Sequence, residues 1–152
     1  MVATLAMATL TVALVFLTAG RGFTPFTLVV PKGFSGPVWI VLDPAGQNIP
    51  LGLRGYRAVV PANGVLRVRS LEPAKVWHEI HDRFSATFDD GSPLPMREAL
   101  PGEVGLRGGG TVTTTKRDGT PMGWMPFFVG TEEQYRENSE PHGIDWPPET
   151  DR

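Results

Sequence analysis

The stretch that decides the fold runs from Phe26 to Ser70, FTLVVPKGFSGPVWIVLDPAGQNIPLGLRGYRAVVPANGVLRVRS. It contains four short runs, at residues 26–30, 38–42, 56–60 and 65–69, that are rich in β-branched and apolar side chains. Pro, Gly or Asn bounds each run. Runs of this kind are typical of half-buried or buried strands. The stretch therefore predicts a small protein built mainly from β-structure.

The runs differ in the faces that they bury. Residues 38–42 are apolar on both faces, which predicts a central strand covered on both sides. Residues 56–60 and 65–69 alternate between apolar and polar side chains, as strands with one face in water do. The turn residues between them, Pro-Ala-Asn-Gly at 61–64, tolerate positive φ and predict that the two runs form a β-hairpin.

The predicted hairpin would place three arginines on the same side of the sheet. Arg57, Arg67 and Arg69 would line one outer face of the sheet. We interpret them as a solvated strand face. A site for an anion or a lipid headgroup is the alternative.

The rest of the chain predicts further strands and turns. Turn chemistry is expected at 43–48, an edge strand at 49–55, a strand at 84–88 and a turn at 89–91. Residues 92–97 are expected to form an edge segment, and the glycine-rich residues 102–110 a mobile loop. A strand is expected at 111–115, followed by a hairpin turn at 117–119. A last strand is expected at 122–129, interrupted by Pro126.

One helix signal stands out, at Thr131-Glu132-Glu133-Gln134. This is a capping box, in which the Thr hydroxyl and the Gln side chain each bond the other residue's backbone N–H. It predicts a helix of two turns at most, with Tyr135 facing the domain.

Many short strands and little helix predict an all-β fold. We expect a two-sheet β-sandwich, immunoglobulin-like or transthyretin-like, with one short C-terminal helix; an open β-barrel is the alternative. The sandwich is expected to span residues 24–138. Residues 139–152, with three prolines and several charges, are expected to form a disordered tail.

The N-terminal segment is set apart by its composition. Residues 2–19 carry no charged side chain, and all 14 Lys and Arg and all 16 Asp and Glu follow Gly20. A run of this length and apolarity predicts that residues 1–20 are a signal peptide or an N-terminal membrane anchor. The protein is therefore expected to be exported, to the periplasm or the outside, either free or anchored by this segment.

Composition excludes several kinds of site and partner. The formal net charge of −2 gives no general attraction to nucleic acid, and contact with a membrane is expected only through residues 1–20 if they are not cleaved. The chain has no Cys, which excludes disulfides, thiolate zinc sites, Cys nucleophiles and a Cys-attached lipid anchor.

Three segments together resemble a known family. They are VPKGFSGPVWI at 30–40, PANGVL at 61–66 and FFVGTEEQY at 127–135. Their order and spacing are similar to those of an uncharacterised family of small exported bacterial proteins and lipoproteins, defined by a domain of unknown function. The resemblance implies export and a compact β-rich domain, and it implies no catalytic residue. This chain departs from the lipoprotein members because it lacks their lipid-carrying Cys.

His78-Glu79-Ile80-His81-Asp82 is the one cluster of metal-type ligands in the sequence. The two histidines are one residue closer than in H-E-x-x-H, and on a strand they would point to opposite faces. In a turn they could converge, with Asp82, Asp89 or Asp90 as a third ligand. We expect each histidine to find a backbone partner instead, and we predict no metal site.

Among the four tryptophans, Trp39 and Trp124 are expected in the core. Trp77 has charged neighbours and is the better candidate for exposure. A G-x-S-x-G nucleophile motif is absent. Trp77, His78 and His81 are therefore the candidate binding residues, and no catalytic residue or cofactor is predicted.

These observations predict a non-enzymatic, exported β-sandwich that acts as a binding or accessory module at the cell envelope. Its expected partner is an envelope protein or a glycan. One alternative is a metal-binding or hydrolytic domain that uses His78 and His81. A second alternative is a purely structural domain at the membrane surface.

Overall fold

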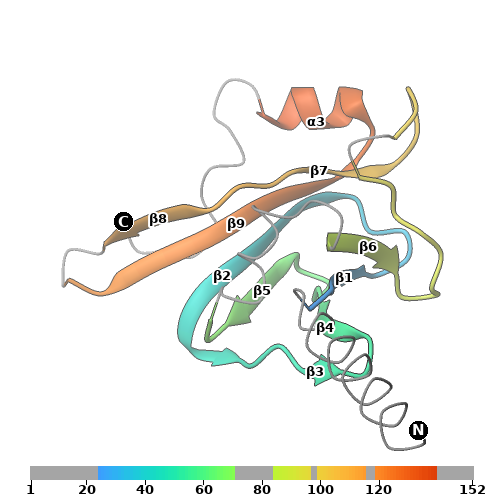
Figure 1. Ribbon diagram of the computed structural model, residues 1–152. Helices are drawn as coiled ribbons and strands as arrows, with labels where there is room; N and C mark the ends of the chain where they lie inside the picture. Colours follow the sequence, from blue (N-terminus) through green and yellow to red (C-terminus); the bar gives the residue numbers. More distant parts are fainter. Residues whose placement is uncertain (1–23, 71–83, 97–98, 116–118, 140–152) are drawn as a thin grey trace, which may run out of the picture.

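The computed structural model describes residues 24–70, 84–96, 99–115 and 119–139 (Figure 1). These residues are mostly strands, which form two mixed sheets that do not close into a barrel, with one short helix near the C-terminal end. The predicted two-sheet sandwich is confirmed. Within these ranges, no helix has the length and apolarity needed to span a bilayer.

The smaller sheet has the strand order β3-β4-β1-β6. Its centre is β1 (Phe26–Val30), which runs parallel to both β4 (Gly55–Val59) and β6 (Phe84–Phe88). The two-residue strand β3 (Leu51–Gly52) pairs with β4 at the edge, as predicted.

The larger sheet has the order β5-β2-β9-β7, and β8 also pairs with β9. Strand β2 (Gly36–Gln47) lies between β5 (Val65–Val68), which is parallel to it, and β9 (Pro121–Gly130), which is antiparallel. Strands β7 (Gly105–Gly108) and β8 (Val112–Thr115) follow each other along the far side of β9. The central place predicted for residues 38–42 is confirmed.

The predicted hairpin between residues 56–60 and 65–69 is wrong. Strand β4 belongs to the smaller sheet and β5 to the larger one, so the turn at 61–64 carries the chain from one sheet to the other. The turn itself forms, since Gly64 N donates to Pro61 O at 2.9 Å. Alternation identified the buried face of each strand correctly, but it does not specify the pairing partner. Each strand pairs in parallel elsewhere, β4 with β1 and β5 with β2.

The prediction that the three arginines line one outer face is wrong for the same reason. Arg57 is exposed on the smaller sheet, whereas Arg67 lies on β5 of the larger sheet, with Arg69 directly after that strand. Arg67 pairs with Asp43 at 3.2 Å, and Arg69 Nε donates to Gly46 O at 2.9 Å.

The turn predicted at 43–48 is instead an irregular part of β2. The register shifts there, because both Leu42 and Gln47 pair with Val68. Asp43 Oδ1 accepts a hydrogen bond from Ala45 N at 2.8 Å, which is the local bond that turn chemistry predicts. Pairing with β5 is interrupted after Leu42 and returns at Gln47, the last residue of β2.

The glycine-rich segment is not a loop throughout, because β7 forms within it and pairs with β9. Pro126 does not interrupt β9. The Pro126 carbonyl accepts a hydrogen bond from Gly109 N at 2.8 Å. In a β-strand the N–H and C=O of one residue point toward the same neighbouring strand. The missing N–H of Pro126 therefore faces the break between β7 and β8, where no ladder bond is lost.

Several predictions fall on residues outside the described ranges. They are the signal peptide or anchor at 1–20, most of the hairpin turn at 117–119, and the tail after Ser139, the last residue of the helix. Strands β8 and β9 are antiparallel neighbours on either side of the predicted hairpin turn.

The main core fills the space between the two sheets. Phe84 of the smaller sheet stacks on Phe26 at 5.3 Å and on Phe127 of the larger sheet at 5.8 Å between ring centroids. A second cluster lies on the opposite face of the larger sheet. It comprises Val41, Met122 and Trp124, with Trp39 and Val65 packed against them.

Candidate functional site

The three residues predicted to bind a ligand, Trp77, His78 and His81, lie outside the described residues. In the part of the chain that the structure describes, no group of three or more His, Cys, Asp or Glu is placed to hold a metal ion. The structure does describe Asp89 and Asp90, which the sequence offered as third ligands.

Asp89 and Asp90 belong to a polar cluster at the turn after β6. Asp89 Oδ1 accepts from Lys32 N at 3.0 Å, and Lys32 Nζ pairs with Asp90 Oδ2 at 3.1 Å. Ser92 donates its hydroxyl to Asp90 Oδ1 at 2.5 Å and accepts from Lys32 Nζ at 2.9 Å. These bonds hold the pKa of Asp90 at about 2, below its ordinary 3.8, with the Ser92 hydroxyl as the largest cause.

This cluster is structural. A lysine that activates a serine needs a free lone pair on its amine. Lys32 Nζ instead donates to Ser92 and pairs with Asp90, and it also lies 4.7 Å from the centre of the Phe88 ring. The cluster ties the loop after β1 to the turn after β6.

Among the described residues, a pocket lies beside the helix α3 (Glu132–Ser139). The predicted capping box starts this helix: Thr131 N donates to Gln134 Oε1 at 2.9 Å, and Gln134 N donates to Thr131 Oγ1 at 3.3 Å. The ring of Tyr135 packs on Phe128 of β9 with centroids 6.0 Å apart. The prediction that Tyr135 faces the domain is confirmed.

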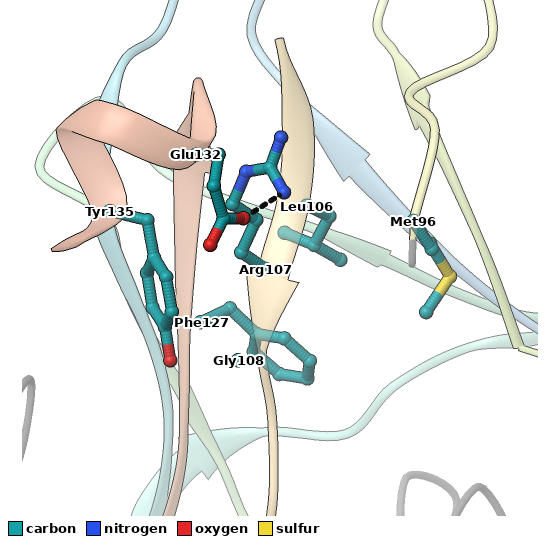
Figure 2. Close-up of a pocket in the computed structure, with 7 residues that line it drawn as sticks. All are labelled: Met96, Leu106, Arg107, Gly108, Phe127, Glu132 and Tyr135. Carbon is teal, nitrogen blue, oxygen red and sulfur yellow. Dashed lines mark hydrogen bonds and ion pairs between the residues drawn. The ribbon is translucent and has the colours of Figure 1, made fainter. Parts of the chain in front are cut away.

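Arg107 of β7 fixes the other side of the pocket. Its side chain is only 10% exposed, and Nη1 pairs with Glu132 Oε2 at 2.6 Å (Figure 2). Two further N–H groups of Arg107 bond backbone carbonyls, from Nε to Gly130 O at 3.2 Å and from Nη2 to Glu103 O at 3.3 Å. The second carboxylate oxygen of Glu132 accepts from Arg136 Nε at 3.1 Å.

The pocket has an apolar floor and a polar edge. Its volume is about 210 Å³. This exceeds the roughly 150 Å³ of a cavity that binds benzene and is below the roughly 300 Å³ at which drug-sized sites begin. It therefore has room for one ring or one branched side chain. The lining residues are Met96, Leu106, Arg107, Gly108, Phe127, Glu132 and Tyr135 (Figure 2).

A wider hollow of about 470 Å³ flanks α3 as well. None of its lining residues belongs to the buried core, and three of them are glutamates. By contrast, Leu106 and Phe127 in the smaller pocket are 3% and 1% exposed. Buried apolar walls beside a few fixed polar groups are typical of binding sites, so the smaller pocket is the candidate site.

Sequence reasoning missed most of this pocket. Arg107 lies in the segment that was predicted to be a loop, and Met96 follows Pro93 and Pro95 in a segment with no periodic pattern. The capping box and the inward direction of Tyr135 were the only signals for it.

Comparison with known proteins adds little. No protein-family model matches this sequence, and no curated protein is significantly similar to it. Among solved structures, a candidate lipoprotein from Bacillus anthracis is similar, with 10% identity and a TM-score of 0.47 over 86% of this chain and 85% of that chain. A similarity at this level assigns neither a family nor a function.

Proposed function

We propose that this chain is an exported, non-enzymatic binding module of the cell envelope, and that the pocket beside α3 receives one apolar side chain of a partner protein. The pocket is the observation that carries this proposal. It combines a buried floor from β7 and β9 with a helix that is locked in place by its cap and by an ion pair.

The chemistry of the pocket favours a protein partner over a glycan. Sugar recognition needs polar groups that are available to ring hydroxyls. Here three of the five N–H donors of Arg107 are engaged by Glu132, Gly130 and Glu103. Leu106 and Phe127 form a buried apolar floor, and a single buried apolar anchor is a common source of binding energy at protein interfaces.

The same contacts support a role in binding rather than in catalysis. Arg107 and Glu132 bond each other, and the second oxygen of Glu132 bonds Arg136. The two charged residues that line the pocket, Arg107 and Glu132, thus neutralise each other and shape its wall. Export is supported by the uncharged segment at residues 2–19.

Binding can be tested by NMR on the full chain in detergent micelles, labelled with ¹⁵N. The probes are N-acetyl-leucine amide, N-acetyl-phenylalanine amide and N-acetylglucosamine. We expect the two amides to shift the Leu106 and Gly108 signals in a saturable way and the sugar to leave them unchanged. A response to the sugar alone would replace the protein partner with a glycan, and no response to any probe would overturn the site.

A pair of variants at Met96 provides the control. Met96→Trp should fill the pocket and abolish the shifts, whereas Met96→Leu keeps the volume and should preserve them. Equal binding by both variants would place the probes elsewhere on the protein.

Export can be tested separately, with alkaline phosphatase fused to the C-terminus of the full chain. This reporter is active only where its disulfides form, outside the reducing cytoplasm. We expect an active fusion. An inactive fusion that is present at a normal level would contradict export.

A further inference from the structure

The larger sheet is apolar on both faces, and its second face needs a cover. Trp124 and Met122 on β9 alternate with Met125 and Phe127, which belong to the main core, so the first pair points away from that core. Yet Trp124 is only 1% exposed. On β2, Val41 belongs to the same outer cluster and is 3% exposed.

Helix α3 lies on this same outer side. Phe128 follows Phe127 along β9 and so points outward, and Tyr135 packs on it. The main contacts of α3 are with β9 and β7, and so the helix covers the C-terminal end of β9. Figure 1 shows α3 turning back above β9, with its last residues directed toward β8 and the first half of β9.

We propose that residues 140–152 continue from α3 along this face and that Trp146 packs against Trp124 and Met122. The chain is long enough. From Phe128 to Trp124 the strand rises about 13 Å, and the seven residues from Glu140 to Trp146 can extend over about 23 Å.

The composition of the segment suits this place. It contains two large apolar residues, Ile144 and Trp146, and the prolines that follow them need no partner for a backbone N–H. The composition of this tail predicted disorder. In the proposed arrangement, packing on the outer face of the larger sheet orders it instead.

A buried donor gives a second, independent reason. The indole Nε1 of Trp39 is buried, and the described residues supply no hydrogen-bond acceptor for it. A buried N–H without an acceptor is costly. An extended segment over this face brings backbone carbonyls, and the Asp145 carboxylate, to the side of the sheet on which Trp39 lies.

The direct test is NMR on the full chain with labelled methionine methyl groups and tryptophan indoles. We expect nuclear Overhauser effects between the Trp146 ring and the Met122 methyl group. We also expect Trp146→Ala to shift the Met122 methyl and the Trp39 indole signals, while Trp77→Ala, the matched control, leaves both unchanged.

Other occupants of the face give different results. If residues 71–83 cover it, Trp77→Ala shifts these signals and Trp146→Ala does not. If a second copy of the chain covers it, the signals depend on protein concentration and the contacts appear between differently labelled molecules. Either result overturns the proposal, and so does a wild-type chain that shows no contact between Trp146 and Met122.

Discussion

At the scale of single residues, Asp90 shows how a few neighbours control a carboxylate at the surface. Two hydrogen bonds from Ser92 and one from Lys32 lower its pKa to about 2, with the Ser92 hydroxyl as the largest cause. Ser92→Ala should therefore raise the pKa of Asp90 toward 3.8, the value in the absence of these partners. A pH titration of the aspartate carboxyl carbons by NMR measures this directly.

The same shift determines how stability depends on pH. A carboxylate whose pKa is lower in the folded state stabilises the fold above its unfolded pKa, and this contribution disappears as pH falls through the folded pKa. The difference in stability between wild type and Ser92→Ala should thus be present above pH 3.8 and vanish as pH falls to about 2. Ser85→Ala, which removes a hydroxyl that pairs with Thr27 instead, is the control. An unchanged Asp90 pKa in Ser92→Ala would contradict this account.

Single residues were predictable where the signal was local. The capping box and the direction of Tyr135 follow from residues within one helical turn, and both were correct. Arg107 was missed because two of its partners, Gly130 and Glu132, lie 23 and 25 residues away along the chain. The burial of Trp124 was predicted, but its position on the outer face depends on the register of β9 with β2, which the sequence does not show.

At the scale of elements, α3 depends on its first turn. A helix of eight residues is marginal in water without tertiary contacts or caps. Thr131→Ala removes the hydroxyl that accepts from Gln134 N and should cost about 1 kcal/mol of unfolding free energy. Urea unfolding measures the cost, and faster amide exchange at Gln134 would locate it. Glu137→Ala, on the exposed side of the same helix, should change neither; equal effects from both variants would rule out the cap as the cause.

The turn between the two sheets depends on Gly64. Its φ of 76° favours glycine, and a Cβ there would clash with the carbonyl oxygen of Pro37. Gly33 has a similar φ of 81° but open space around it, which makes Gly33→Ala a matched control for backbone strain alone. We expect Gly33→Ala to cost about 1–2 kcal/mol and Gly64→Ala at least twice as much, measured by urea unfolding. Equal costs would show that the close approach to Pro37 has no effect.

Elements could be predicted from the sequence more reliably than their pairing. Most strands were found because period-two alternation and flanking turn residues are local signals. The hairpin failed because β4 and β5 adopt parallel partners that lie far away in the sequence. Strand β7 was missed because glycine contributes little to a strand pattern, although Gly105 and Gly108 pair with residues of β9.

At the scale of the whole molecule, the fold class was predictable because it depends on how many strands have an apolar face that must be buried. Short strands with one apolar face are covered by packing two sheets together. The mixed parallel and antiparallel order of each sheet was not predictable, because it depends on long-range pairings that composition and alternation do not determine. The candidate pocket depends on these pairings too, since the pairing of β7 with β9 brings Arg107 beside Glu132 at the start of α3.

The two sheets should unfold together, because the phenylalanine stack of the core crosses between them. Phe84 lies between Phe26 and Phe127, and Phe84→Ala should cost about 3–5 kcal/mol. In a chain whose Trp77 and Trp146 are replaced by Phe, the fluorescence of Trp39 and Trp124 reports on the larger sheet, whereas far-ultraviolet circular dichroism reports on both sheets. If the core is shared, both probes should show one coincident transition whose midpoint moves to a lower urea concentration.

Val59→Ala, on an exposed part of the smaller sheet, should cost under about 0.5 kcal/mol. Because Phe84 belongs to the smaller sheet, two separate transitions in Phe84→Ala would mean that each sheet is stable without the other.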